Sequence, residues 1–288
     1  DLQIRRGGCA ANIAFGMASL GLRPILVGAV GADFADYRSW LERHGVDCDS
    51  IHVSELRHTA RFLCTTDQDH NQIASFYTGA MAEARDIELE PIAQRVGGLD
   101  LVVVSPNDPD AMLRHTEEAR VRGIPFAADP SQQLARMGGD EIRELIDGAA
   151  YLFANDYEMG LIKQKTGWSE EDILARVGVC VTTMGPKGAR VDRAGEPPVH
   201  VPAAPEERKA DPTGVGDAFR AGFLAGLAWG LSYERCAQLG NLTATHVLET
   251  VGCQEYTLGR QRFLERFAAA YGRAAADEVA AHAKFHHP

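Results

Sequence analysis

The sequence predicts a doubly wound α/β fold, in which helices cover both faces of a mostly parallel sheet. Short apolar runs recur along the chain, and stretches with the spacing of an amphipathic helix separate them, as at Ile142, Leu145 and Ile146. Strands that are apolar along their whole length are typical of a parallel sheet buried on both faces. Ligands of such folds bind at the loops beyond the carboxyl ends of the strands. The strand-like runs cover residues 24–28, 101–104, 124–128, 151–153 and 177–181.

Residues 48–77 depart from this alternation. Three β segments follow one another there, at residues 51–53, 60–64 and 73–77, and the polar turn Asp67–Gln72 separates the last two. We expect residues 48–77 to form a small β-sheet lid that stands off one α/β domain made of residues 1–47 and 78–288. An extra hairpin on the edge of the main sheet is the alternative.

Helical spacing is clearest at the two ends of the chain. Ile13, Met17 and Leu20 mark the first helix. After Thr213 the chain reads as almost wholly helical, with glycine and alanine at positions suited to close packing. A last helix carries Phe263, Leu264, Phe267 and Tyr271 on one side, and we expect these side chains in the core.

Composition restricts the partners of the chain. Of 288 residues, 29 are Lys or Arg and 40 are Asp or Glu, so the net charge is −11. An acidic chain lacks the basic surface that nucleic-acid binding needs, and no apolar run approaches the roughly 20 residues of a membrane span. The six cysteines form no C-x-x-C pair and no zinc-ligand spacing. We therefore expect a cytoplasmic protein with no nucleic-acid or membrane partner.

The strongest motif is a glycine-rich turn that opens directly into a helix. Asp211, Pro212 and Thr213 lead into Gly214–Gly216, and Asp217 follows in the first helical turn. Converging backbone amides and the positive end of the helix dipole form an anion hole. A carboxylate beside it can accept a proton from a hydroxyl while the amides receive charge from a transferring phosphoryl group. A plain helix cap with a tight turn is the alternative.

Two further motifs lie at helix starts. Gly7 and Gly8 precede a helix in which Asn12 is early enough to reach a ligand. Asn155 and Glu158 follow the apolar run at residues 151–153 and lie on one helical face, where they could order water around a Mg²⁺ ion. A capping box, in which these two side chains only satisfy the helix start, is the alternative.

These three motifs, in this order and at these separations, resemble those of the ribokinase-like (PfkB) sugar and nucleoside kinases. The resemblance covers essentially the whole chain and implies the ribokinase-like fold with a β lid. A closer likeness is to the actinobacterial adenosine kinases, which are similar to this chain in having Val215 where most members have alanine. The stretches that carry it are residues 6–16, 75–85, 129–136, 165–168 and 211–226.

The resemblance implies an ATP-dependent kinase that converts adenosine to AMP. Asp217 would be the general base on the 5′-hydroxyl, and the amides of Gly214, Val215, Gly216 and Asp217 the anion hole. Arg136 would face the phosphates. The nucleoside would be held by Gly8, Asn12, Gln132, Gln133 and Phe62, with Phe62 covering the base.

The resemblance also implies a site for Mg²⁺ and ATP on the other side of the anion hole. Mg²⁺ would lie near Asn155 and Glu158, largely through water, and K⁺ could bind at Asp211 and Thr213. The ATP contacts would come from Asn155, Thr183, Gly185, Gly188, Gly214, Gly216 and Asn241.

Other interpretations stay open. A kinase of a free sugar such as ribose or fructose shares the same motifs, and a non-catalytic nucleoside or sugar sensor could share the fold. A dinucleotide-dependent oxidoreductase fits the fold class but lacks the G-x-G-x-x-G fingerprint. Lids of this family often pair between subunits, so we expect a homodimer. The family's first strand, which supplies an Asp for the sugar diol, precedes the Gly7–Gly8 turn, so we expect the native chain to be longer.

Overall fold

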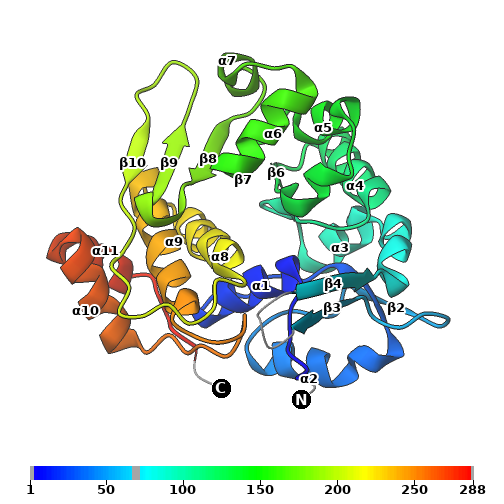
Figure 1. Cartoon of the computed structure of the whole chain (residues 1–288), viewed down its shortest axis with the longest axis horizontal. Coiled ribbons are helices and arrows are strands. Elements are labelled where there is room, and N and C mark those ends of the chain that lie inside the picture. Colours follow the sequence, from blue (N-terminus) through cyan, green and yellow to red (C-terminus); the bar gives the residue numbers. More distant parts are fainter. Residues whose placement is uncertain (1–2, 67–71, 287–288) are drawn as a thin grey trace.

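A six-stranded sheet forms the centre of the computed structural model, which describes residues 3–66 and 72–286 (Figure 1). Four neighbouring strands are parallel. The two strands at one edge, which come last in the sequence, run antiparallel to their neighbours. The mostly parallel sheet that the apolar runs predict is therefore confirmed. Its strands, in spatial order, are β10 (Val199–Val201), β9 (Ala189–Asp192), β8 (Val179–Thr183), β7 (Tyr151–Asn155), β6 (Phe126–Ala128) and β5 (Val102–Val104).

Helices cover both faces of this sheet because successive side chains of each strand point in opposite directions. Leu152 packs toward one helical layer, whereas Phe153 packs on the other, with its ring 5.4 Å from that of Phe223. The first layer holds α4 (Pro109–Arg122), α5 (Gly139–Ile146) and α6 (Asp156–Thr166). The second holds α1 (Cys9–Ser19), α8 (Val215–Ala228) and α9 (Tyr233–Leu248).

The expected strand at residues 24–28 is wrong. This segment makes a single bridge, between Ile25 and Asp47, and the strand β1 (Gly28–Gly31) begins only after it. Pro24 has no N–H to donate to a neighbouring strand. β1 pairs in parallel with β2 (Ile51–Ser54), so β2 belongs to a separate two-stranded sheet and not to an antiparallel lid.

The antiparallel pair of residues 48–77 is thus confined to β3 (Arg61–Thr66) and β4 (Gln72–Tyr77). Most of the expected polar turn, residues 67–71, lies outside the described residues. Asp33 fixes the base of this hairpin, because its carboxylate accepts from the Thr59 amide (2.8 Å) and pairs with Arg61 (2.7 Å). Burial by itself would raise the pKa of Asp33, but these donors lower it to about 2.

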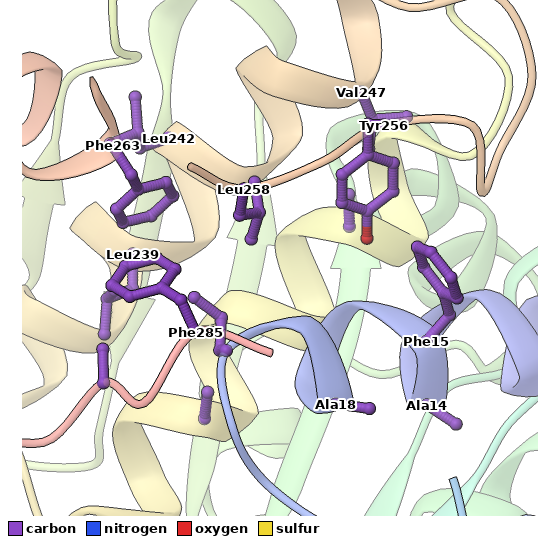
Figure 2. Close-up of a cluster of buried hydrophobic side chains, with 14 of the residues drawn as sticks. Ala14, Phe15, Ala18, Leu239, Leu242, Val247, Tyr256, Leu258, Phe263 and Phe285 are labelled. Carbon is purple, nitrogen blue, oxygen red and sulfur yellow. The ribbon is translucent and has the colours of Figure 1, made fainter. Parts of the chain in front are cut away.

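A cluster of buried side chains joins the second helical layer to the C-terminal helices (Figure 2). Phe263 and Phe267 of α10 (Arg260–Tyr271) are fully buried, as the sequence predicts. α8 and α9 approach closely, since a Cβ on Gly222 would lie 2.5 Å from the Leu239 carbonyl oxygen. Glycine at this position is therefore required by contact and not by a turn. In the described residues no helix combines the length and hydropathy of a membrane span.

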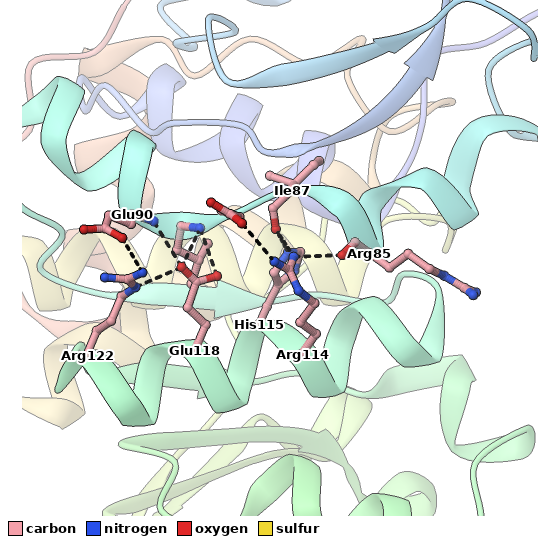
Figure 3. Close-up of polar contacts among 9 residues, drawn as sticks. Arg85, Ile87, Glu90, Arg114, His115, Glu118 and Arg122 are labelled. Carbon is pink, nitrogen blue, oxygen red and sulfur yellow. Dashed lines mark hydrogen bonds and ion pairs between the residues drawn. The ribbon is translucent and has the colours of Figure 1, made fainter.

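Polar contacts from α4 fix the neighbouring helix α3 (Leu89–Val96) (Figure 3). Glu118 accepts from the Leu89 and Glu90 amides at 3.0 and 3.1 Å, and so satisfies donors at the start of α3. Arg122 pairs with both Glu118 and Glu90. A surface hollow of about 580 Å³ lies against these residues, away from the site described below.

The remaining elements are short or peripheral. They are η1 (Ala32–Phe34), α2 (Ala35–Arg43), η2 (Gly79–Asp86), η3 (Ser131–Ala135), α7 (Glu170–Leu174), η4 (Gly185–Lys187) and α11 (Arg273–Ala280).

Candidate active site

The start of α8 has the geometry of an anion-binding turn. Gly214 is the N-cap with φ of 80°, and a Cβ there would lie 3.0 Å from the sulfur of Cys253, so both backbone and space favour glycine. Amides in the first turn of a helix lack intrahelical acceptors. The Val215 amide is 3.4 Å from the Pro212 carbonyl oxygen. Gly216 and Asp217 therefore present the amides that are best placed to receive an anion.

Asp217 meets the second motif across 205 residues of sequence. Asn12 Nδ2 of α1 donates to Asp217 Oδ2 at 2.8 Å, and Asn12 itself is buried. Burial raises the pKa of Asp217 to about 6, and the hydrogen bond from Asn12 opposes the rise. Since this pKa lies below 7, the carboxylate is ionised at neutral pH and remains basic enough to take a proton.

Gly8 begins α1 with φ of 99°, a conformation that favours glycine. Gln132 in η3 approaches this turn, with its Nε2 3.6 Å from the sulfur of Cys9. Gln133 is buried instead, and its amide donates to the Asn107 carbonyl at 2.6 Å. Of the two glutamines, Gln132 is therefore the one placed to reach a ligand near the Gly7–Gly8 turn.

Arg136 directly follows η3 as its C-cap and is exposed. Within residues 3–66 and 72–286, its guanidinium has no hydrogen-bond or ion-pair partner, so its side chain is uncommitted. Phe62 on β3 is also exposed, at 68%.

A buried ion pair behind the anion hole was not indicated by the sequence motifs. Arg220 Nε lies 2.6 Å from Asp129 Oδ2, and the two side chains are only 6% and 1% exposed. Arg220 also donates to the Gly216 carbonyl at 3.1 Å, so it holds the first turn of α8. The sequence feature that could have indicated this pair is Arg220 itself, a charged residue inside an otherwise apolar helix. Such residues are almost never buried without a partner.

Asn155 and Glu158 form the local capping box that competed with the metal interpretation. Asn155 accepts from the Glu158 amide at 2.7 Å, and Glu158 accepts from the Asn155 amide at 2.8 Å. The second oxygen of Glu158 accepts from Ser131, which has the unusual φ of 44° for a residue with a side chain. Carboxylate lone pairs remain for ordered water. A water-mediated role toward Mg²⁺ fits this geometry and stays a prediction.

The residues expected at ATP lie around the β8–β9 turn and on α9. Thr183 ends β8, and Gly185 and Gly188 have φ of 56° and 91° in the tight turn that follows. A Cβ on Gly188 would lie 2.0 Å from the Val201 carbonyl oxygen. Asn241 is buried, and its Nδ2 donates to the Pro202 carbonyl at 2.9 Å, so it fixes the end of β10.

Asp211 joins the turn before α8 to the segment after α9. Its carboxylate accepts from the Thr213 amide at 2.9 Å and from the Gly252 amide at 3.1 Å. Burial by itself would raise the pKa of Asp211, but these donors lower it below its usual value. A K⁺ ion at Asp211 and Thr213 stays a prediction. The described residues hold no group of three or more His, Cys, Asp or Glu side chains arranged around a metal.

Comparison with known proteins decides the family. The family model described as pfkB family carbohydrate kinase matches residues 1–258. The chain belongs to the pfkB family. Its ribokinase-like fold agrees with that membership.

Individual relatives of this pfkB-family chain are nucleoside kinases. It is 31% identical over 250 residues to a nucleoside kinase of Methanocaldococcus jannaschii. That alignment covers 86% of this chain and 80% of the relative. The solved structure of Burkholderia thailandensis nucleoside kinase in complex with inosine superposes with a TM-score of 0.85 at 35% identity. That alignment covers 92% of this chain and 88% of the other. Adenosine kinase of Sinorhizobium meliloti has a TM-score of 0.71 at 28% identity, covering 86% and 79%.

Proposed function

We propose that the chain is an ATP-dependent nucleoside kinase that phosphorylates the 5′-hydroxyl of adenosine to give AMP. One observation carries the proposal: Asn12 holds the Asp217 carboxylate at the start of α8, beside amides that are free to receive an anion. In the reaction a bond forms between the 5′-oxygen and the γ-phosphorus, and the bond from that phosphorus to ADP breaks. The hydroxyl proton passes to Asp217.

The chain's own groups contribute positioning and charge stabilisation. The Gly216 and Asp217 amides, with the helix dipole behind them, are suited to the negative charge of the transferring phosphoryl group. Arg136 is uncommitted and exposed, and a guanidinium suits bidentate contact with phosphate. Kinases of this type generally use Mg²⁺ with ATP, where the ion neutralises charge on the phosphates. Glu158 would order water around it.

We assign adenosine as the substrate on the basis of the Gln132 amide and of the similar proteins. The amide of Gln132 near the Gly7–Gly8 turn is neutral, and a neutral amide suits a purine edge better than a charged group would. The similar proteins named above include an adenosine kinase and a nucleoside kinase bound to inosine. A free sugar such as ribose or fructose is the second candidate, because Gly8 and Asn12 would serve any ribose-like diol.

A substrate panel tests the proposal. With Mg²⁺ and ATP present, we expect adenosine to give ADP release with a kcat/KM at least about tenfold above that for ribose, fructose or cytidine, which corresponds to roughly 1.4 kcal/mol of discrimination. Mass spectrometry should identify AMP as the product. A higher kcat/KM for a free sugar would contradict the nucleoside assignment, and no turnover with any of them would favour the sensor.

We also propose that the β3–β4 hairpin pairs two copies of the chain. Its two faces both carry exposed apolar side chains, which is unusual for a two-stranded sheet facing water. Phe62 pairs with Phe76 across the hairpin on one face. The other face carries Leu63, Ile73 and Tyr77, which are 51%, 77% and 46% exposed. We assign the Phe62 face to the nucleoside and the opposite face to the partner subunit.

Sedimentation at micromolar concentration should therefore give the mass of a dimer. Replacing Leu63 and Ile73 by serine should shift the protein to monomers, because the apolar contact between hairpins is lost. Val121→Ser is the matched control, since Val121 is 78% exposed on α4 and far from the hairpin in the chain. Wild-type protein that sediments as a monomer would exclude this assembly.

A further inference from the structure

A buried glutamine, Gln254, lies behind the Asn12–Asp217 contact and has a hydrogen-bond partner for every polar hydrogen. The residue is 1% exposed, in the segment between α9 and α10. Its Oε1 accepts from Trp40 Nε1 at 3.2 Å. Its Nε2 donates to Asn12 Oδ1 at 2.9 Å and to the Tyr37 hydroxyl at 2.5 Å. These contacts link α2, α1 and the start of α8 through one side chain.

The direction of each hydrogen bond in this chain follows from its first member. An indole N–H can only donate, so the oxygen of the Gln254 amide must face Trp40. The nitrogen of the same amide then faces Asn12, and Asn12 must present its oxygen to it. The Asn12 nitrogen is left to face Asp217, to which it donates at 2.8 Å. A reversed amide at either position would set two acceptors or two donors against each other.

We propose that Gln254 is a positioning residue of this site: through its amide, the indole N–H of Trp40 determines which end of the Asn12 amide faces the Asp217 carboxylate. Within the described residues Gln254 makes no hydrogen bond to the Asp217 carboxylate, so it reaches that group only through Asn12. The proposal rests on the proposed role of Asp217 as general base.

We call the hydrogen-bonded line from Trp40 through Gln254 and Asn12 to Asp217 the relay. Packing holds Trp40, its first member, in place. The Trp40 ring stacks on Phe15 at 6.2 Å with an interplanar angle of 7°, and the Arg6 guanidinium lies 4.0 Å from the Trp40 ring centre. A second branch runs from Gln254 to Tyr37, whose hydroxyl donates to the Gly7 carbonyl at 2.8 Å. Gln254 therefore supports both halves of the first motif, the Gly7–Gly8 turn through Tyr37 and the Asn12 side chain directly.

The relay has a consequence for the pH dependence of the reaction. A donor that faces a carboxylate favours its ionised form, whereas a carbonyl oxygen facing it favours the protonated form. If Gln254 no longer fixes Asn12, the Asn12 amide can turn its oxygen toward Asp217, and a higher pH is needed to ionise the base. The titratable and charged groups that face Asp217 from other positions are Cys9, Asp129, Arg220, Cys253 and Tyr256, and the variants below leave all of them unchanged.

The test is the acid limb of kcat/KM against pH, which reports ionisation of the free enzyme. Gln254→Met keeps the length of the side chain but removes both the acceptor and the donor. We expect the acid limb to move to higher pH by about one unit, since an Asp217 carboxylate without the Asn12 donor is harder to ionise. In an Asn12→Ala background the same substitution should produce no further shift, because the relay acts only through Asn12.

Two more variants separate the relay from simple packing. Tyr37→Phe removes the Gly7 branch but leaves the line from Trp40 to Asn12, so the acid limb should stay in place even if KM for the nucleoside rises. Trp40→Phe keeps a ring on Phe15 and removes the N–H donor, so it should shift the limb in the same direction as Gln254→Met. This variant keeps the test decisive if Gln254→Met fails to fold.

The outcomes distinguish this proposal from the proposed function. A wild-type acid limb that neither Gln254→Met nor Trp40→Phe moves would overturn the relay alone. An equal shift with and without Asn12 would also overturn it, because Gln254 would then act by another route. Full turnover in Asp217→Asn would remove the general base itself, and the relay with it.

Discussion

Asp217→Asn is expected to lower kcat by about 10²–10⁴-fold, the contribution typical of a positioned general base. The substitution keeps the shape of the side chain, and an amide oxygen at this position can still accept from Asn12. Nucleoside affinity should therefore change little. The measurement is kcat from steady-state ADP release together with the dissociation constant for adenosine from calorimetry.

The pH profile gives this prediction a second readout. Because burial raises the pKa of Asp217 to about 6, the wild-type kcat/KM should fall below that pH as the carboxylate takes up a proton. The asparagine variant has no proton to gain there, so its residual activity should lack this limb. Asp277→Asn on α11 is the matched control, since that side chain is 63% exposed and should retain full activity. Unchanged turnover in Asp217→Asn would contradict the assignment of the base.

Asp129→Ala is expected to destabilise the protein by about 3–5 kcal/mol, the loss typical of leaving a buried charge without its partner. Arg220 would stay buried with its guanidinium 3.9 Å from Glu158 as the nearest remaining carboxylate. Such a loss is a large fraction of the stability of an ordinary domain. Urea unfolding followed by circular dichroism measures it as a fall in the midpoint at constant slope.

Replacing both partners separates the charge from the packing. Asp129→Leu combined with Arg220→Met should recover most of the lost stability, because no charge is left buried. Activity should stay low in this double variant, since the contact from Arg220 to the Gly216 carbonyl, which holds the first turn of α8, is gone. Asp277→Ala, which breaks an exposed pair with Arg273, is the control and should cost less than about 1 kcal/mol. An equally small loss in Asp129→Ala would show that the buried pair contributes little.

Features that depend on local spacing were predictable from the sequence. The strands near residues 101–104, 124–128, 151–153 and 177–181 follow from apolar runs, and β5–β8 lie there within a few residues. Burial of an entire strand needs no knowledge of its neighbours, because each residue must be apolar wherever the sheet is covered on both faces. The glycine turns were also predictable, because a left-handed backbone conformation favours glycine at a single position.

Features that depend on pairing were not predictable in the same way. β2 reads as a β segment, but its choice of β1 as a parallel partner depends on where the chain returns. β9 and β10 are three or four residues long and alternate with polar side chains such as Arg190 and His200, so their periodicity is weak. The spacing of Asn155 and Glu158 fits both a capping box and a role beside a metal, so spacing alone does not exclude either.

The fold class, the family motifs and the separate candidate roles of Asp217 and Asn12 follow from residue type and short-range spacing. That these two side chains contact each other, and how the contact is supported, depends on the folded chain. The contacts of Arg220 with Asp129 and of Gln254 with Trp40 and Asn12 join residues between 91 and 242 positions apart. Hydrogen bonds and ion pairs require atoms within about 3 Å, and sequence periodicity carries no information on which distant side chains folding will bring that close.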